Sequence, residues 1–582
     1  MKLIDALKLV AATAPAAGRP RFDVGLVCGF TPLHFETFLT AHLRQRMPDR
    51  HVSVSTGLFG DIPGTLRHLI DHPVDAAVVA LEWADVDPRL GIRALGGWSP
   101  RRLPEVVEHA AMWLDQVLQL TRDLAATIPV VINLPTLPVA PIFFTASWQA
   151  SAYETQLQAN LWNFAAAAAA HPRIRVINPQ RVDLESPAAE RLLVSSTLAY
   201  GFPYQNAHAE RLAATLARAV ENRQPMKGVI TDLDDTLWSG IAGDDGVENV
   251  SWDLDHHTQG HGLYQQLLSA LSEAGVLVAI VSKNEPAVVD AAFAREDLLL
   301  RRERVFPLEV GWGSKADAVG RVLARWNVGA DAVVFIDDNA AELEEVKAAH
   351  PAVECLRFPH GDPQAIYDLL IRLRDLFGRT ALSAEDTLRL DSLREATGSS
   401  DVPDQSEGHS EALLERADAS LVLDFSKDAN DARAFELISK TNQFNLNGRR
   451  PTERGWAEYL RDPHTFLLTA TYKDRFGALG KVAVLAGRVE DSRVQVETWV
   501  MSCRAFSRRI EHQCLKALFD RFAAREVSFA FNETPRNGPM ARFLTSLQDG
   551  AAGAPVSADV FHAACPRLFH RVVFKDACPA GN

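Results

Sequence analysis

Two aspartates that follow a short apolar run are the residues of this sequence best placed for chemistry. Asp232 and Asp234 come directly after residues 228–230, which are too few and too β-branched for a helix and therefore predict a buried strand. Because residues two apart on a strand point the same way, the two carboxylates should share one face. Clustered carboxylates repel one another unless a cation lies between them, and their hard oxygens suit Mg²⁺. One carboxylate could then attack phosphorus as a nucleophile while the other transfers a proton.

The sequence DLDDTLW at residues 232–238 resembles the DxDxT motif of the haloacid-dehalogenase (HAD) phosphotransferases. Further elements follow in that family's order: Ser282 after a second apolar run, then Lys315, then two acids after a third run. The resemblance implies that Ser282 hydrogen-bonds the phosphoryl group and that Lys315 balances negative charge. It also implies Mg²⁺ as cofactor, with Asp232, Asp234 (through its backbone carbonyl), Asp337 and Asp338 as metal ligands, and Thr236, Lys283 and Asn284 as substrate contacts.

Apolar runs at residues 228–230, 275–282 and 332–339 enclose a helical pattern at residues 259–274. Such alternation predicts a parallel, doubly wound α/β sheet with its site at the carboxyl ends of the strands. Too few residues separate the first motif from Ser282 to form a large lid domain. Another part of the chain must therefore shield the site or present the substrate.

Length and composition set the broad class of the protein. A chain of 582 residues, 47% hydrophobic and 23% charged, is typical of a globular protein with several domains. A net charge of -14 argues against a nucleic-acid or anionic-membrane binder. No apolar run has the length of a membrane span, and the first residues lack a signal peptide's apolar region. Six scattered cysteines without a Cys-x-x-Cys pair favour a reducing compartment, so we expect a cytoplasmic protein.

Polar, proline-bearing segments predict the domain boundaries. Residues 221–225 precede the first HAD strand, and residues 397–408 read as a linker rich in acidic, Gly and Ser residues. We therefore expect an α/β domain, a HAD-like domain, a helical connector and an α+β domain. Their predicted limits are residues 1–222, 223–378, 379–415 and 416–582.

The first of these domains carries apolar runs at residues 24–27, 75–81 and 128–133. Their order resembles the SGNH-hydrolase fold, whose first strand is followed by a Gly-Asp-Ser nucleophile. Here that place reads Cys28-Gly29-Phe30-Thr31, so the resemblance implies a degenerate scaffold without hydrolase activity. The alternative is that Cys28 or Thr31 replaces the nucleophile. His208 stands roughly where the catalytic histidine of that family would be, although a helix-end histidine is the plainer interpretation.

The last domain has strand-like runs at residues 466–471, 481–486 and 494–501, followed by a helix at residues 507–524. This order resembles the acyl-CoA N-acyltransferase (GNAT) fold, in which a pantetheine arm enters between strands and its phosphates meet the helix start. The loop at residues 504–509 contains three arginines but lacks the glycines of that family.

Residues 440–450, 473–477 and 501–504, and residues 335–339 together with Glu342, resemble motifs of the FkbH-like proteins. That family takes 1,3-bisphosphoglycerate, removes phosphate and delivers a glyceryl unit as a thioester to an acyl carrier protein in polyketide assembly. The resemblance therefore implies a carrier protein with its phosphopantetheine arm as the partner.

This resemblance covers residues 225–575, with two departures from the family's pattern. Residues 507–511 replace a Gly-containing run, and residues 447–448 replace a Thr-rich one. The resemblance implies a three-carbon substrate, and because of these two departures that substrate is an expectation only.

Acyl transfer from an acyl phosphate suits a thiol nucleophile, and Cys503 is the best candidate. It lies at a strand end before a helix amino terminus and beside Arg504, and both features lower the pKa of a thiol. A buried structural cysteine is the alternative. Asn442, Gln443 and Asn445 could bind glyceryl hydroxyls or an oxyanion, although an Asn-rich turn explains them nearly as well. Four arginines, Arg449, Arg450, Arg508 and Arg509, could meet an acidic carrier protein or be simply solvated.

Two other functions stay open. A small-molecule phosphatase would release phosphate without forming a thioester on the protein. A non-catalytic partner module of a synthase would keep its function when Asp232 is replaced by asparagine.

Overall fold

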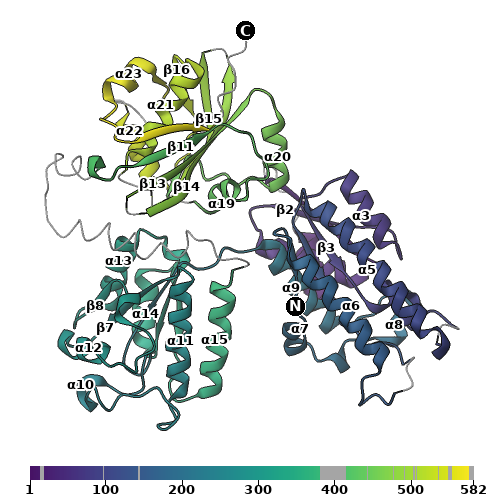
Figure 1. Ribbon diagram of the computed structural model, residues 1–582. Coiled ribbons are helices and arrows are strands. Elements are labelled where there is room, and N and C mark those ends of the chain that lie inside the picture. The colour runs from purple at the N-terminus through teal and green to yellow at the C-terminus, as the bar shows by residue number, and fades with distance from the viewer. Residues whose placement is uncertain are drawn as a thin grey trace. The chain divides into compact units, whose positions relative to one another are not determined.

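The computed structural model describes residues 1–12, 19–95, 98–141, 145–379, 414–441, 443–475, 477–490, 492–502, 505, 508–534, 536–547 and 553–575. The protein is of the α/β class, as the sequence predicts, with two parallel sheets and one mixed sheet (Figure 1). The chain divides into two compact units, Met1–Arg223 with Pro451–Trp456, and Gln224–Arg450 with Ala457–Asn582. The connector predicted at residues 379–415 lies almost wholly outside the described residues.

The first sheet has the order β2-β1-β3-β4-β5, and all its pairings are parallel. Its strands are β1 (Arg21–Cys28), β2 (His51–Thr56), β3 (Ala76–Ala80), β4 (Val130–Asn133) and β5 (Ile174–Val176). The sequence predicts only β1, β3 and β4. The two edge strands are largely half-exposed, so they carry little of the apolar pattern that marks a buried strand.

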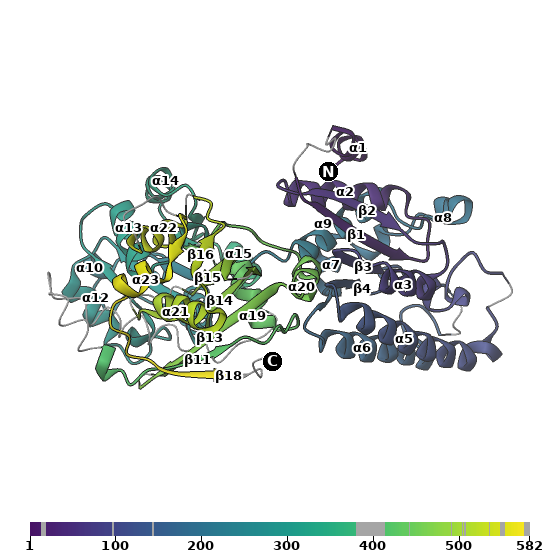
Figure 2. The same ribbon diagram turned by 90° about the horizontal axis from the view of Figure 1, so that it is seen from above.

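Helices cover both faces of this sheet, as Figure 2 shows from above. On one face pack α3 (Ile62–Asp71), α5 (Leu103–Ala125) and α6 (Ala152–Ala169), and on the other α1 (Leu3–Ala12), α2 (Leu33–Arg46) and α9 (Asn206–Glu221). Alternating residues of the strands feed the two cores, since successive side chains point to opposite faces. The short helices α4 (Trp83–Val86), α7 (Pro179–Glu185) and α8 (Val194–Tyr200) lie in the connections.

The second sheet has the order β10-β9-β6-β7-β8 and is also fully parallel. Its strands are β6 (Gly228–Thr231), β7 (Leu277–Ser282), β8 (Leu308–Val310), β9 (Val333–Asp337) and β10 (Glu354–Arg357). Helices α11 (Gln259–Glu273), α12 (Pro286–Phe293) and α15 (Pro363–Phe377) pack on one face, and α13 (Lys315–Trp326) and α14 (Ala340–Ala349) on the other. Only the four-residue helix α10 (Ala242–Asp245) and loops lie between β6 and α11, so the described residues contain no lid domain there.

The third sheet is mixed, with the order β17-β16-β15-β14-β13-β11-β18. Its strands are β11 (Ser420–Asp424), β12 (Phe444–Asn445), β13 (Thr465–Asp474), β14 (Gly477–Glu490), β15 (Arg493–Met501), β16 (Glu526–Phe529), β17 (Val556–Ser557) and β18 (Arg571–Lys575). The helices in this part of the chain are α19 (Ala432–Lys440), α20 (Glu453–Arg461), α21 (Ile510–Phe522), α22 (Gly538–Ser546) and α23 (Ala558–Ala564). The two-residue strand β12 pairs with β15 outside the main strand path.

Among the described residues, no helix combines the length and the apolar character needed to cross a bilayer.

Candidate active site

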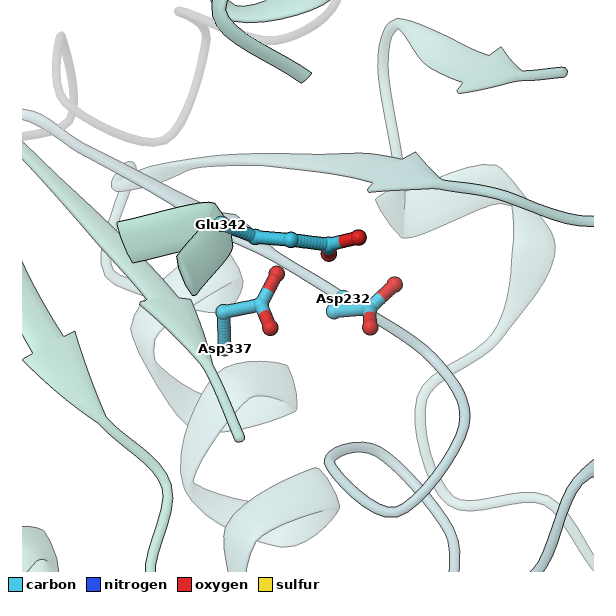
Figure 3. A group of neighbouring side chains, drawn as sticks. All are labelled: Asp232, Asp337 and Glu342. Carbon is cyan, nitrogen blue, oxygen red and sulfur yellow. The ribbon is translucent and has the colours of Figure 1, made fainter. Parts of the chain in front are cut away.

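The carboxyl ends of three neighbouring strands in the second sheet bring the predicted chemistry together. Asp232 follows β6, Ser282 ends β7 and Asp337 ends β9, while Lys315 is the first residue of α13. Since β6 lies between β7 and β9, these ends meet at one edge of the sheet. Figure 3 shows Asp232 and Asp337 as neighbours, with Glu342 beside them.

Lys315 lies among these acids. Its Nζ is 2.9 Å from Asp232 Oδ2 and 2.6 Å from Asp337 Oδ2, and it also contacts Glu342. Burial alone would lower the pKa of this lysine, but the charges of Asp232 and Asp337 and its hydrogen bonds raise that pKa above its ordinary value. The side chain is therefore a permanent positive charge at the point where a phosphoryl group would carry negative charge.

The residues present also fit a divalent cation. Asp232, Asp337 and Glu342 each offer one oxygen, and these oxygens lie within 4.8 Å of one another. Asp232 Oδ1 is buried without a hydrogen-bond partner, which is costly for a carboxylate oxygen unless a cation or substrate meets it. Burial and the neighbouring charge of Asp232 raise the pKa of Asp337, so excess negative charge is concentrated here. Oxygen donors of this kind suit Mg²⁺.

Glu342 is the member of this group that sequence reasoning did not select as a ligand. It lies in the first turn of α14, five positions after Asp337, where the start of the helix turns the chain back over the strand end. Its presence in the motif with residues 335–339 was the only signal. Of the predicted ligands, Asp338 lies outside this cluster of oxygens, and its backbone N–H donates to Thr236 Oγ1 at 3.2 Å.

The Asp234 carboxylate is held by donors on both oxygens. Trp238 Nε1 and the Ala242 N–H donate to Oδ1 at 2.9 Å and 3.0 Å, and Asn284 Nδ2 donates to Oδ2 at 2.9 Å. Burial nevertheless raises the pKa of Asp234, which favours a group that can carry a proton. Asn284, predicted as a substrate contact, thus orients the carboxylate for which the sequence predicts proton transfer. The buried Trp238 has the same role, and no sequence signal identified it.

The remaining predicted residues of this site lie around the cluster. Ser282 is buried at the end of β7, and its carbonyl accepts from the Gly311 N–H at 3.1 Å. Lys283 Nζ lies 3.1 Å from Glu342 Oε1, which links it to the charge network of Lys315. Lys283 is therefore part of the charged cluster, whereas the Thr236 hydroxyl accepts from the Asp338 backbone N–H.

The predicted acyl-transfer site is described only in part. Cys503, Arg504 and Asn442 lie outside the described residues. Asn445 is buried; its Oδ1 accepts from the N–H groups of Asn447 and Gly448 at 3.2 Å and 2.8 Å, and its Nδ2 donates to the Thr441 carbonyl. These contacts favour the interpretation of an Asn-rich turn, completed by Gly448 at φ +71°. Gln443 Oε1, in contrast, is buried without a partner.

The parallel strands β15 and β16 diverge after a short pairing. Arg493–Val496 pair with Glu526–Phe529, and beyond that point β15 pairs with β12 instead. Asn447 Nδ2 donates to the carbonyls of Glu497 and Ala530, at 2.9 Å and 3.1 Å, and so bridges the two diverging chains. Residues 444–447 therefore occupy the space between β15 and β16 beyond their short pairing.

The candidate nucleophiles of the first domain are poorly activated. The Cys28 thiol donates to the Phe30 carbonyl at 3.4 Å, and burial raises the pKa of Cys28 far above its ordinary value. Thr31 donates its backbone N–H to the Gly201 carbonyl. Neither residue has a hydrogen bond to a basic side chain among the contacts of the described residues, which favours the degenerate-scaffold interpretation.

His208 is enclosed in a satisfied network. Its Nε2 lies 2.9 Å from Thr136 Oγ1 and its Nδ1 lies 2.9 Å from Ser186 Oγ, and Thr136 also donates to the buried carboxylate of Glu82. Burial lowers the pKa of His208 to about 3. A histidine that is uncharged at neutral pH and has both ring nitrogens hydrogen-bonded stabilises the domain rather than acting as a base.

Replacing His208 with glutamine should make the stability of this domain less sensitive to acid. In the unfolded chain this histidine is protonated below about pH 6.5, whereas in the native state it is protonated only near its pKa of about 3. The free energy of unfolding therefore decreases as pH falls from about 6.5 to about 3. The loss is about 1.4 kcal/mol per pH unit for one proton. Hydrogen exchange of α9 in the full chain at several pH values measures it. Exposed His72→Gln is the control, and an equal acid sensitivity in both variants would contradict the assignment.

No family model matches the chain, and a search of the curated proteins finds no match. Solved structures are similar in fold. The N-terminal part of the protein BF1531 from Bacteroides fragilis, described as containing a phosphatase domain complexed with Mg, has a TM-score of 0.51 at 17% identity, over 66% of this chain and 100% of that one. The salicylyl-acyltransferase SsfX3 from a tetracycline biosynthetic pathway has a TM-score of 0.22 at 14% identity, over 36% of this chain and 55% of that one. The first similarity supports the fold, and the second is too low to carry an argument.

Proposed function

We propose that this protein is a Mg²⁺-dependent HAD-type phosphatase that also transfers an acyl group. Its substrate would be 1,3-bisphosphoglycerate or a related acyl phosphate, and its product a glyceryl thioester on an acyl carrier protein. The observation that carries the phosphatase half is the free, buried Asp232 oxygen beside the charged Lys315. The acyl-transfer half rests on the resemblance of residues 440–450 and 501–504 to FkbH-like motifs.

The arrangement of the described side chains supports the following route for phosphate removal. The Asp232 carboxylate attacks phosphorus, and the bond to the substrate oxygen breaks as Asp234 gives that oxygen a proton. Asp234 then takes a proton from water, which attacks the phospho-aspartate and releases inorganic phosphate. Lys315 offsets the charge of Asp232 and of the transferred group throughout.

Asp232, Asp337 and Glu342 would hold the cation, in the group whose oxygens lie within 4.8 Å of one another. When bound, Mg²⁺ supplies neutralisation of the phosphoryl oxygens. The similar fold of a phosphatase domain complexed with Mg supports this choice of metal.

Acyl transfer would proceed at a thiol. The Cys503 thiolate attacks the acyl carbon, the bond from that carbon to the phosphate oxygen breaks, and phosphate leaves. The phosphopantetheine thiol of the carrier then attacks the enzyme thioester and releases Cys503. Because both the attacking and the leaving group are thiols, this second step breaks one thioester bond and forms another.

The test is incubation of the protein with 1,3-bisphosphoglycerate and Mg²⁺, followed by phosphate assay and intact-protein mass spectrometry. We expect phosphate release, lowered by a chelator on the order of 10³-fold because several kcal/mol of charge stabilisation are lost, together with a glyceryl adduct on the protein. Phosphate release without an adduct would identify a plain phosphatase. Release that is indifferent to the chelator would contradict the HAD mechanism.

A further inference from the structure

Helix α11, which follows the first motif in the chain, has a buried face that is mostly polar. His261, Tyr264, Gln265 and Leu268 lie three or four positions apart, so they share one face of the helix, and all four are buried. Three of them carry polar atoms. Burying a polar atom costs free energy unless it finds a hydrogen-bond partner, and apolar side chains would avoid that cost. The partners of these three residues therefore indicate what the helix face does.

Each of the three side chains donates a hydrogen bond to residues 231–237, the segment that carries both aspartates of the first motif. The pairs are Tyr264 Oη with Thr231 Oγ1 at 2.9 Å, His261 Nδ1 with the Thr236 carbonyl at 3.0 Å, and Gln265 Nε2 with the Leu237 carbonyl at 2.9 Å. The acceptors lie before Asp232 and after Asp234, so the helix holds the segment on both sides of the two carboxylates. We call His261, Tyr264 and Gln265 the polar face of α11.

On the side before the aspartates, the hydrogen bond from Tyr264 continues to the peptide of the nucleophile. Thr231 Oγ1 donates to the Asp232 carbonyl at 2.9 Å, so its single proton is used there and it accepts from Tyr264. Burial raises the pKa of Tyr264 far above its ordinary value, so the phenol keeps the proton that it donates. The chain of bonds from Tyr264 through Thr231 therefore fixes the carbonyl of Asp232.

On the side after the aspartates, the polar face holds a strained turn. Asp235 has φ +50°, a backbone conformation that a residue other than glycine adopts at a cost and keeps only where its surroundings hold it. His261 and Gln265 bind the two carbonyls that follow this turn. Gln265 is itself fixed, because its Oε1 accepts from the Leu299 N–H at 3.1 Å.

We propose that His261, Tyr264 and Gln265 are positioning residues, which hold the first motif in the geometry that phosphoryl transfer requires. The effect on rate rests on the proposed function, while the restraint of the segment rests on burial and hydrogen bonds alone. These bonds go to two carbonyls and a hydroxyl and not to the carboxylates of Asp232 and Asp234, so the three residues act through the backbone. A nucleophile displaced by about 1 Å can lose on the order of 10²-fold in rate.

The first test is Tyr264→Phe in the full chain, with acetyl phosphate and Mg²⁺ as the probe. The change removes one hydroxyl and keeps the ring. We expect kcat to fall about tenfold, the size of one hydrogen bond, and KM to stay within about twofold because no substrate contact is changed. Tyr367→Phe is the matched control, since Tyr367 is 55% exposed on α15 in the same domain, and it should keep the wild-type kcat.

The second test asks whether Tyr264 acts through Thr231. Thr231→Val removes the hydroxyl between Tyr264 and Asp232 at nearly constant size. The double variant Tyr264→Phe, Thr231→Val should then have the kcat of Thr231→Val alone, since both changes break the same chain of bonds. Effects on kcat that multiply in the double variant would overturn this route.

The third test compares two substitutions of similar size at His261. Asparagine can place an N–H where Nδ1 lies, whereas leucine cannot, so His261→Asn should keep most of kcat and His261→Leu should lose about tenfold. If His261 only filled space, the two variants would lose activity equally, and that result would overturn the inference.

Amide hydrogen exchange without substrate separates this inference from the proposed function. Tyr264→Phe and His261→Leu should exchange faster at residues 231–238, with β7 unchanged. A wild type that releases no phosphate would overturn the proposed function, and the exchange rates alone would then support or overturn the restraint. Unchanged exchange at residues 231–238 would overturn the inference. Faster exchange throughout the domain would overturn it as well, because it would show a general loss of stability.

Discussion

Replacing Asp232 with asparagine is expected to lower Mg²⁺-dependent phosphate release by roughly 10⁴-fold or more, since loss of a nucleophile removes the covalent step entirely. The change also removes one charge from the group around Lys315, which contacts Asp232, Asp337 and Glu342. The amide is nearly the same size, and Lys315 keeps two carboxylate partners, so the fold should persist. Phosphate release under saturating substrate measures the loss.

The control is Asp290→Asn, an exposed acid on α12 in the same domain, which should retain full activity. Rapid acid quenching should trap a phosphorylated wild-type protein and an unmodified Asp232→Asn protein. Turnover that survives in the Asp232 variant, or a phosphoryl adduct on it, would mean that another residue is the nucleophile.

The sequence predicts the three inner strands of the second sheet, β6, β7 and β9, because they are fully buried and the candidate site residues lie at their ends. The edge strands β8 and β10 are partly exposed and were not predicted. Asp232, Ser282 and Asp337 all come at the ends of apolar runs. Locating these strands in the sequence therefore also locates the candidate site residues. Glu342 and Trp238 were not selected because each returns to the site through a turn of the chain rather than through a strand. Glu342 does so at the first turn of α14, and Trp238 through its indole donor to Asp234.

The third sheet is less accessible to sequence reasoning. A two-residue strand such as β12 has no periodicity, yet it decides whether the gap between β15 and β16 is open or filled. Asn447 bridges that gap by donating hydrogen bonds to two backbone carbonyls. The sequence does not distinguish such a residue from a polar loop residue whose side chain is solvated. The Asn-rich segment therefore supplies structure, where its composition alone suggested a ligand site as readily as a turn.

The first domain shows the reverse situation. Its apolar pattern predicts strands β1, β3 and β4, but it does not indicate that Cys28 and His208 are held by hydrogen bonds. The contacts of His208 join residues far apart in the sequence, which no local pattern indicates.

The four cysteines that the structure describes are all poor candidates for the acyl-transfer thiol. Burial raises the pKa of Cys355 to about 11 and raises the pKa of Cys565 as well. Cys28 and Cys514 are buried, and the pKa of each is raised far above its ordinary value. Since the thiolate is the reactive form, none of the four is activated.

Cys503→Ala should therefore abolish the glyceryl adduct while phosphate removal by Asp232 continues. Cys503 lies outside the described residues, and its case rests on its place beside Arg504 and before the helix α21 in the sequence. Exchange between two thioesters is nearly isoenergetic, so a cysteine relay passes the acyl group on at little cost, whereas a serine ester would hold it. Intact-protein mass spectrometry should show the adduct on the wild type, its discharge by holo carrier protein, and its absence in the variant. Cys565→Ala is the matched control and should keep the adduct. An undiminished adduct in Cys503→Ala would move the relay to another nucleophile, with Cys578, the other cysteine outside the described residues, the next to replace.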